Sequence, residues 1–211
     1  MNEELRNIYN KIYKSVNARH PQRGLLKPYG SDGLRDGVFI NYLIEHFLPR
    51  NTTVLDASCG RAHLLRTLLN LGFIAEGTEI SSYLVNNELK DLPVHLAAYD
   101  ELDSLGKKYD VVISNDVLEH MPDEESVFEA MKSLCDISNK HVLICVCTNR
   151  GARNWPTALN LKIQDLHLVN RSAEWWKKVI DRYIKVDDDF EVFRKDRVIR
   201  LYSFGTKKCI Q

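Results

Sequence analysis

The sequence predicts one α/β domain of the doubly wound type, built on a mostly parallel seven-stranded sheet. Short apolar runs alternate with amphipathic helical segments from residue 51 to residue 184, and this alternation is typical of parallel strands joined by helices. Three runs are almost continuously apolar or β-branched, as strands buried on both faces are, at 52–55, 109–115 and 141–147. Two final runs, 189–194 and 198–206, flank a short polar turn and predict a terminal antiparallel hairpin.

The composition indicates a globular protein with balanced charge. The 211 residues fit one domain with a sizeable core. Lysine plus arginine and aspartate plus glutamate number 29 each, and a net charge of zero argues against a nucleic acid partner. The chain starts MNEELRNIYN without an apolar signal segment, and its five cysteines lack metal-binding spacing. We therefore expect reduced thiols, no metal site, a cytoplasmic location and, because no apolar run could span a bilayer, no membrane partner.

Residues 1–50 are predicted to form a helical cap in front of the sheet-forming region, residues 51–211. Apolar side chains recur at helical spacing in 3–17 and again in 38–48, where Pro49 ends the pattern. We expect the first of these helices to pack on the domain as a lid or as a wall of its site.

The stretch from Asn51 to Ile80 contains a strand, a glycine turn, a helix and a second strand in succession. The first strand stops at Asp56, which small residues follow. A stripe of leucines then indicates an amphipathic helix up to Gly72, and the second strand ends at Glu79. Both carboxylates are therefore expected at the carboxyl edge of the sheet, where open α/β folds bind ligands.

Helices and strands continue to alternate after this opening unit. Ser81 is placed to cap a helix that runs to about Lys90, and a short strand is expected at 93–97. Residues 99–105 are irregular or form one short helix. Ser172 is placed to cap the last helix before the hairpin.

The strand at 109–115 ends at polar Asn115, which marks a second strand end to consider as part of a site. Pro122 is expected in the first turn of the helix that follows, a position that accepts proline. Cys145 and Cys147 point to the same face of the next strand and are expected to be buried packing residues.

The first turn indicates what kind of ligand this edge binds. A dinucleotide site needs the pattern G-x-G-x-x-G so that a pyrophosphate can reach the helix N-terminus. Here Gly60 is the one glycine of the turn, and Asp56 places a negative charge where phosphate would lie. An acidic turn suits instead a ligand that carries an ammonium group and a sulfonium and no phosphate.

Three segments resemble class I S-adenosylmethionine-dependent methyltransferases, whose fold is Rossmann-like. VLDASCGRA resembles their first motif, an apolar strand followed by D-x-G-x-G, although Ser58 and Ala62 stand where the pattern has glycines. YDVVISNDVLEHM resembles the fourth-strand motif of the small-molecule branch of this family, and IQDLHLVNRSAEWWKKVI is similar to a late segment of that branch. Together the resemblance covers roughly residues 35–205, and the combination is more specific than any single motif.

The resemblance implies S-adenosylmethionine as cofactor and S-adenosylhomocysteine as product. It assigns Asp56 to the ammonium group, Glu79 to the ribose hydroxyls and Ile80 to the adenine, although plain core packing explains Ile80 equally well. The other implied contacts are the backbone at Ser58, Cys59 and Gly60 with the methionine part, Tyr99 or a neighbour with the adenine, and Asn115 and Leu118 at the methyl-donor end.

Two histidines are candidates for a catalytic base, because methyl transfer to a hydroxyl or a protonated amine requires one. His120 follows the strand that ends at Asn115, and His167 lies in a long loop after the next strand, so both segments should border the pocket. A hydrogen bond to the backbone at a helix start explains His120 equally well.

Two loops are candidates for binding the methyl acceptor. The segment 20–37, rich in glycine and proline, carries Tyr29 among basic residues, and the segment 148–170 carries Arg150 and Trp155. Guanidinium groups suit a phosphate or a carboxylate on the acceptor. Solvated surface loops are the alternative interpretation.

We therefore expect an S-adenosylmethionine-dependent methyltransferase that modifies an oxygen or nitrogen atom of a small molecule. A phosphorylated sugar, a nucleotide-sugar or a surface-glycan precursor is the preferred acceptor, on the basic loops alone. The alternatives are an RNA or protein methyltransferase, and a methyltransferase-like binding subunit without turnover, for which Ser58 and Ala62 are the only hints. A monomer and a homodimer are both compatible with the sequence.

Overall fold

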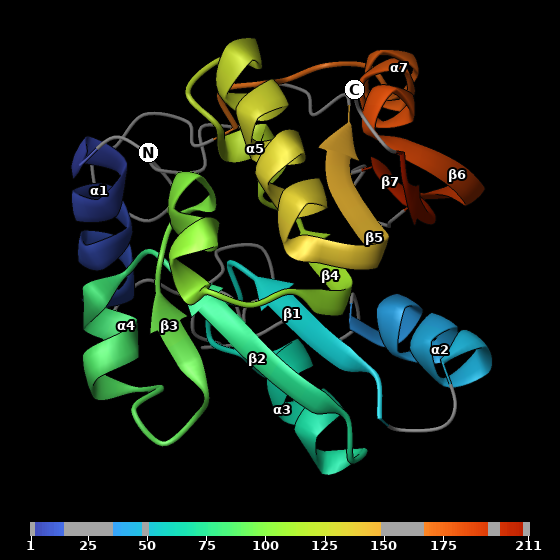
Figure 1. Ribbon diagram of the computed structural model, residues 1–211. Helices are drawn as coiled ribbons and strands as arrows, with labels where there is room; N and C mark the ends of the chain where they lie inside the picture. The colour runs from blue at the N-terminus through green and yellow to red at the C-terminus, as the bar shows by residue number, and fades with distance from the viewer. Residues whose placement is uncertain (1–2, 15–35, 48–50, 149–166, 194–198, 209–211) are drawn as a thin grey trace.

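One mixed sheet organises the molecule, which we describe from a computed structural model (Figure 1). The structure describes residues 3–14, 36–47, 51–148, 167–193 and 199–208. The strands are β1 (Thr53–Ala57), β2 (Ile74–Glu79), β3 (Val94–Leu96), β4 (Tyr109–Asn115), β5 (Ser138–Thr148), β6 (Ile184–Phe193) and β7 (Ile199–Lys207). Their order in the sheet is β3-β2-β1-β4-β5-β7-β6.

The direction of the strands confirms the predicted fold class. β1 pairs in parallel with β2 and β4, β2 with β3, and β4 with β5. β7 runs antiparallel between β5 and β6. The sheet is therefore a doubly wound, mostly parallel seven-stranded sheet with an antiparallel hairpin at its end.

Helices cover both faces of the sheet; in Figure 1, α5 lies in front of it and α3 behind it. The α-helices are α1 (Glu3–Lys14), α2 (Asp36–His46), α3 (His63–Asn70), α4 (Ser82–Asn87), α5 (Glu124–Ile137) and α7 (Ala173–Tyr183). Two short 3₁₀ helices are η1 (Tyr99–Leu105) and η2 (Leu118–His120). Within the described ranges, no helix combines the length and apolar character needed to cross a bilayer.

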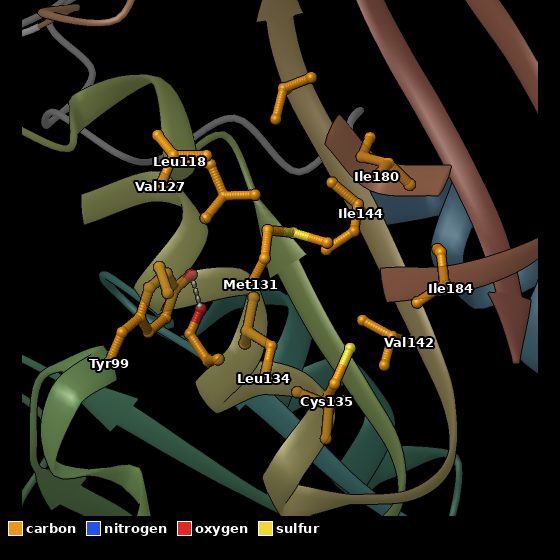
Figure 2. Close-up of a cluster of buried hydrophobic side chains, with 14 of the residues drawn as sticks. Tyr99, Leu118, Val127, Met131, Leu134, Cys135, Val142, Ile144, Ile180 and Ile184 are labelled. Atoms are coloured by element: carbon orange, nitrogen blue, oxygen red, sulfur yellow. Dashed lines mark hydrogen bonds between the residues drawn. The ribbon is translucent and has the colours of Figure 1, made fainter. Parts of the chain in front are cut away.

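The central strands are buried on both faces, which explains their continuous apolar sequence. Figure 2 shows Val142 and Ile144 of β5 on the same side as Met131 of α5, and all three belong to one hydrophobic cluster. Cys145 belongs to the cluster on the opposite face, and Cys147 is also buried. The prediction that both cysteines are packing residues is therefore confirmed.

Both N-terminal helices share the core of the domain. Phe39 of α2 is fully buried, and its ring centroid lies 5.6 Å from that of Tyr202 and 5.7 Å from that of Phe204. On α1, the amide oxygen of Asn10 accepts a hydrogen bond of 2.8 Å from the hydroxyl of Ser81. Whether the first helix works as a lid stays a prediction.

Two predicted boundaries are wrong, for local physical reasons. β6 begins directly after α7, where buried Ile184 pairs with Lys207. The prediction missed this start because the exposed acidic residues that follow on this edge strand hide its alternation of apolar and polar residues. Helix α5 begins after Asp123, whose carboxylate accepts a 2.8 Å hydrogen bond from the backbone N–H of Ser126. Pro122 therefore precedes the helix cap and does not occupy the first turn.

Candidate active site

The turn after β1 is held in an unusual backbone conformation. Ser58, Gly60 and Ala62 all have positive φ, at 62°, 54° and 57°. The N–H of Ser58 donates to the hydroxyl of Thr78 at 3.0 Å, and the N–H of Cys59 donates to the carbonyl of Thr78 at 2.7 Å. Left-handed residues at alternate positions, tied to β2, turn the chain sharply from strand to helix.

Glu79 at the end of β2 holds the other side of this turn. Its side chain is 3% exposed, and its two carboxylate oxygens accept hydrogen bonds from the N–H of Gly60 at 3.0 Å and of Ser81 at 2.8 Å. Burial raises the pKa of Glu79 to about 7, and the backbone N–H groups partly oppose that rise. The carboxylate is thus positioned by two backbone groups at the edge of the sheet.

Asp56 and Cys59 lie beside it. Asp56 is 3% exposed and sits between Gly77 of β2 and Ile113 of β4 in the sheet register. A Cβ atom on Gly77 would come within 2.9 Å of the Cys59 sulfur, so this thiol packs beneath the turn. Burial raises the pKa of the Cys59 thiol, as do the neighbouring charges of Asp56 and Glu79. Both effects favour the protonated thiol over the reactive thiolate.

The other residues predicted to contact the cofactor differ in how deeply they are buried. Tyr99 is buried, with its hydroxyl 2.8 Å from that of Ser114 and hydrogen-bonded to it, and Leu118 is fully buried in the cluster shown in Figure 2. Ile80 is 7% exposed at the end of β2, and Asn115 is partly exposed at the end of β4. The turn, Glu79 and the end of β4 thus share one edge of the sheet, while Tyr99 and Leu118 support it from the core; their contact with a cofactor stays a prediction.

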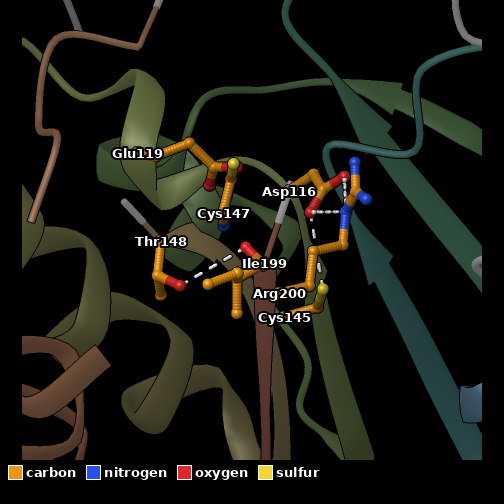
Figure 3. Close-up of polar contacts among 7 residues, drawn as sticks. All are labelled: Asp116, Glu119, Cys145, Cys147, Thr148, Ile199 and Arg200. Carbon is orange, nitrogen blue, oxygen red and sulfur yellow. Dashed lines mark hydrogen bonds and ion pairs between the residues drawn. The ribbon is translucent and has the colours of Figure 1, made fainter. Parts of the chain in front are cut away.

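A buried ion pair that sequence reasoning missed fixes the end of β4. Arg200 of β7 donates from Nε to both carboxylate oxygens of Asp116, at 2.9 and 2.8 Å, and both side chains are largely buried (Figure 3). Asp116 itself has a positive φ of 53°. The signal in the sequence was one arginine between two apolar residues of the strand, Ile199 and Leu201.

The two predicted histidines lie together, and a glutamate joins them. The ring centroids of His120 and His167 are 4.5 Å apart. The N–H of Val169 donates to the carbonyl of Glu119 at 3.1 Å, which fastens the His167 segment to η2. Burial raises the pKa of Glu119, and the charge of Asp116 raises it further. Sequence reasoning missed Glu119, although it directly precedes His120.

Helix α1 forms a wall that reaches from the turn to the histidines. The hydroxyl of Tyr13 would lie 3.3 Å from a Cβ atom on Gly60. One helical turn earlier, the ring of Tyr9 meets that of His120 edge-on, with centroids 6.2 Å apart. The turn after β1 and the histidine pair therefore border the same region of the molecule.

Residues 34–186 match the family model described as a methyltransferase domain. The chain belongs to this family. The predicted assignment to the class I methyltransferases is thus confirmed. No curated protein sequence gives a significant match.

Solved structures share the fold at low sequence identity. The magnesium protoporphyrin IX methyltransferase of Synechocystis PCC 6803, with bound S-adenosylhomocysteine, has a TM-score of 0.68 and 17% identity, over 97% of this chain and 95% of that one. The 1,6-didemethyltoxoflavin-N1-methyltransferase of Burkholderia thailandensis has a TM-score of 0.65 and 14% identity, over 97% and 87%. A TehB-like methyltransferase of Corynebacterium glutamicum has a TM-score of 0.62 and 17% identity, over 98% and 100%.

The residues predicted to bind the acceptor lie outside the described part of this methyltransferase. Tyr29, Arg150 and Trp155 all fall in ranges that the structure does not describe. Their role stays a prediction from the sequence.

The positive φ of Ser58 predicts which substitutions this position of the turn tolerates. A β-branched residue at a φ of 62° is strained, so we expect Ser58→Val to lower the free energy of unfolding by about 1–3 kcal/mol. Chemical denaturation measures this loss. The matched variant Ser58→Gly reaches the same φ without strain and should remain within about 1 kcal/mol of the wild type. Equal stability of the valine and glycine variants would mean that the turn does not hold this conformation in solution.

Proposed function

We propose that this methyltransferase transfers a methyl group from S-adenosylmethionine to an oxygen or nitrogen atom of a small molecule. The observation that carries the proposal is the buried Glu79 carboxylate, hydrogen-bonded to the N–H of Gly60 within a turn of left-handed residues. Structures with the same fold contain S-adenosylhomocysteine, as in the Synechocystis enzyme, or this product together with its small-molecule substrate, as in the Burkholderia enzyme.

The residues at the sheet edge fit this cofactor in chemical type. Glu79 offers an anionic acceptor to ribose hydroxyls, and Asp56 offers a negative charge to an ammonium group. A side chain on Gly60 would meet the Tyr13 hydroxyl, so α1 packs directly against the bare backbone of the turn. When bound, the cofactor supplies an electrophilic methyl group on sulfur; the protein's part is to orient the two reactants and to exclude water.

His120 and His167 are proposed to act on the proton of the acceptor. His120 lies in η2 and His167 in the segment before α7, and the ring of His120 contacts Tyr9 of the α1 wall. A neutral imidazole can accept a proton from a hydroxyl or an ammonium group, and a pair of imidazoles can also hold a cation that acidifies a hydroxyl. Either role would assist transfer to oxygen or nitrogen.

For the acceptor, we propose a small molecule with an anionic group, of which a phosphorylated sugar, a nucleotide-sugar or a surface-glycan precursor is the preferred kind. The support is the basic and aromatic content around Tyr29, Arg150 and Trp155. The balanced net charge disfavours RNA, which remains the second candidate together with a protein substrate.

Calorimetric titration of the full chain with S-adenosylmethionine and S-adenosylhomocysteine tests the proposal. We expect both to bind to a single site. Incubation with methyl-labelled cofactor and pooled metabolites should then yield a product that is one methyl group heavier. Failure of both ligands to bind would refute the proposal, and binding without transfer to any metabolite, RNA or protein pool would identify a silent binding subunit.

Cofactor affinity is expected to depend on pH through Glu79. Its pKa is raised to about 7, and ribose hydroxyls donate to the ionised form, so protons compete with the cofactor. Affinity should therefore be highest above pH 7 and should fall by up to about tenfold per pH unit below it. The cofactor's amino group, with a pKa of about 7.7–8.0, stays charged below pH 7 and therefore does not contribute to this fall in affinity. Titrations at several pH values measure the slope; Glu79→Gln should remove it, and a flat wild-type profile would place the ribose elsewhere.

A further inference from the structure

Three metal-ligating side chains converge where the histidines meet. One ligand atom each from Glu119, His120 and His167 lies within 4.8 Å of the others. Glu119 and His120 come from η2, and His167 is brought to them by the hydrogen bond between Val169 and the Glu119 carbonyl. Residues far apart in the sequence are thus assembled by tertiary structure into one cluster.

The carboxylate of Glu119 is buried, and one of its two oxygens has no hydrogen-bond partner in the described part of the chain. The other oxygen accepts a 3.1 Å hydrogen bond from the N–H of Cys147. A buried carboxylate with an unsatisfied oxygen is costly unless a proton, a cation or a donor completes it.

Arg200, whose charge acts on Glu119, already has a partner. Figure 3 shows the guanidinium of Arg200 joined to Asp116, and no hydrogen bond or ion pair between Arg200 and Glu119 is found in the described part of the chain. Glu119 instead lies beside the two imidazoles, with one of its carboxylate oxygens within 4.8 Å of a nitrogen of each. A carboxylate and two imidazoles are three groups that commonly act together as metal ligands.

We infer that Glu119, His120 and His167 bind one divalent transition-metal ion, of the class of Zn²⁺, Mn²⁺ or Fe²⁺. Two nitrogen ligands and one oxygen ligand suit these ions, and disfavour Mg²⁺ and Ca²⁺, which prefer oxygen alone. Ligand atoms around a tetrahedral ion lie roughly 3.3 Å apart, so the three ligand atoms, which lie within 4.8 Å of one another, would move closer together when an ion binds. Cysteine spacing pointed to no metal site, but it carries no information about this one.

The role of the ion rests on the proposed methyl transfer. Three protein ligands leave a position for an acceptor hydroxyl, whose pKa the ion lowers. The proton then leaves to solvent, the acceptor oxygen forms its bond to the methyl carbon, and the carbon–sulfur bond breaks with its electron pair on sulfur. Imidazoles that donate their lone pairs to the ion cannot also accept this proton, so the ion replaces a histidine base.

Metal binding is measured on the full chain after chelator treatment and without cofactor. We expect calorimetry with ZnCl₂ or MnCl₂ to give one ion per chain, and MgCl₂ to bind at least about 100-fold more weakly. CoCl₂ should give visible absorption bands typical of a four- or five-coordinate site with nitrogen ligands. His120→Ala, His167→Ala and Glu119→Gln should each weaken Zn²⁺ binding by at least about tenfold.

Controls separate the site from adventitious binding and from misfolding. His46→Ala removes a half-exposed histidine of α2 and should leave Zn²⁺ affinity unchanged. Because Glu119 is buried, the more accessible His120→Ala and His167→Ala carry the test if Glu119→Gln fails to fold. Absence of Zn²⁺ and Mn²⁺ binding, or binding that survives both histidine variants, would overturn the inference.

The same protein distinguishes the failure of this inference from the failure of the proposed function. S-adenosylmethionine is titrated into metal-free protein in parallel. Cofactor binding without metal binding would refute the metal site alone, whereas metal binding without cofactor binding would refute the methyltransferase proposal and leave the metal site standing.

Discussion

Glu79→Ala is expected to weaken S-adenosylmethionine binding by about 1–3 kcal/mol, which corresponds to about a 5- to 150-fold rise in Kd. We propose that the carboxylate accepts hydrogen bonds from ribose hydroxyls, and a charge-assisted hydrogen bond in a buried setting is among the stronger kinds. The same carboxylate holds the N–H groups of Gly60 and Ser81. Its loss therefore removes a ligand contact and loosens the turn that the cofactor rests on.

Calorimetry at about pH 8, where Glu79 is ionised, measures this effect most directly. Glu125→Ala, which removes an exposed glutamate from α5, is the matched control and should leave Kd unchanged. Thermal unfolding of both variants establishes that they are folded at the titration temperature. An alanine variant with wild-type affinity would show that Glu79 organises the turn without touching the cofactor.

Arg200→Met is expected to lower the free energy of unfolding by about 3–5 kcal/mol, the largest effect on stability that we predict. The arginine and Asp116 have side-chain exposures of 12% and 9%, so water replaces little of the lost interaction. The methionine variant would leave the Asp116 carboxylate buried without its cation. Because Asp116 directly follows β4, the loss would also disturb the segment that carries Glu119 and His120.

Urea denaturation of four proteins separates the ion pair from simple packing. The wild type, Arg200→Met, Asp116→Asn and the double variant form a cycle. Asparagine tolerates the positive φ of Asp116, so its backbone cost is small. The double variant should be more stable than Arg200→Met alone, because it no longer buries an unpaired charge. A methionine variant within about 1 kcal/mol of the wild type would mean that the pair behaves like an exposed one.

Several features of the site were accessible from the sequence because they depend on neighbours along the chain. The β1 strand, the turn and the β2 strand are consecutive, and parallel pairing of their strands brings Asp56 and Glu79 to the same edge. Burial on both faces made β4 and β5 readable as apolar runs. The resemblance of these segments to methyltransferase motifs then led to the family that the chain belongs to.

Other features depend on contacts between distant segments, which no local pattern encodes. The hairpin was predicted, but its insertion with β7 next to β5 was not, and that register alone sets Arg200 beside Asp116. Both histidines were predicted to border the pocket. Their meeting with Glu119 relies on one backbone hydrogen bond from Val169.

The fold class, the acidic turn and the two strand ends could be predicted from the sequence, because hydrophobic periodicity and turn chemistry act over a few residues. The tertiary structure alone decided burial: it made Glu79 a carboxylate held by two backbone groups, and it enclosed Glu119 against His120 and His167. The desolvation of a charged group depends on everything packed around it, and that environment exists only once the chain has folded.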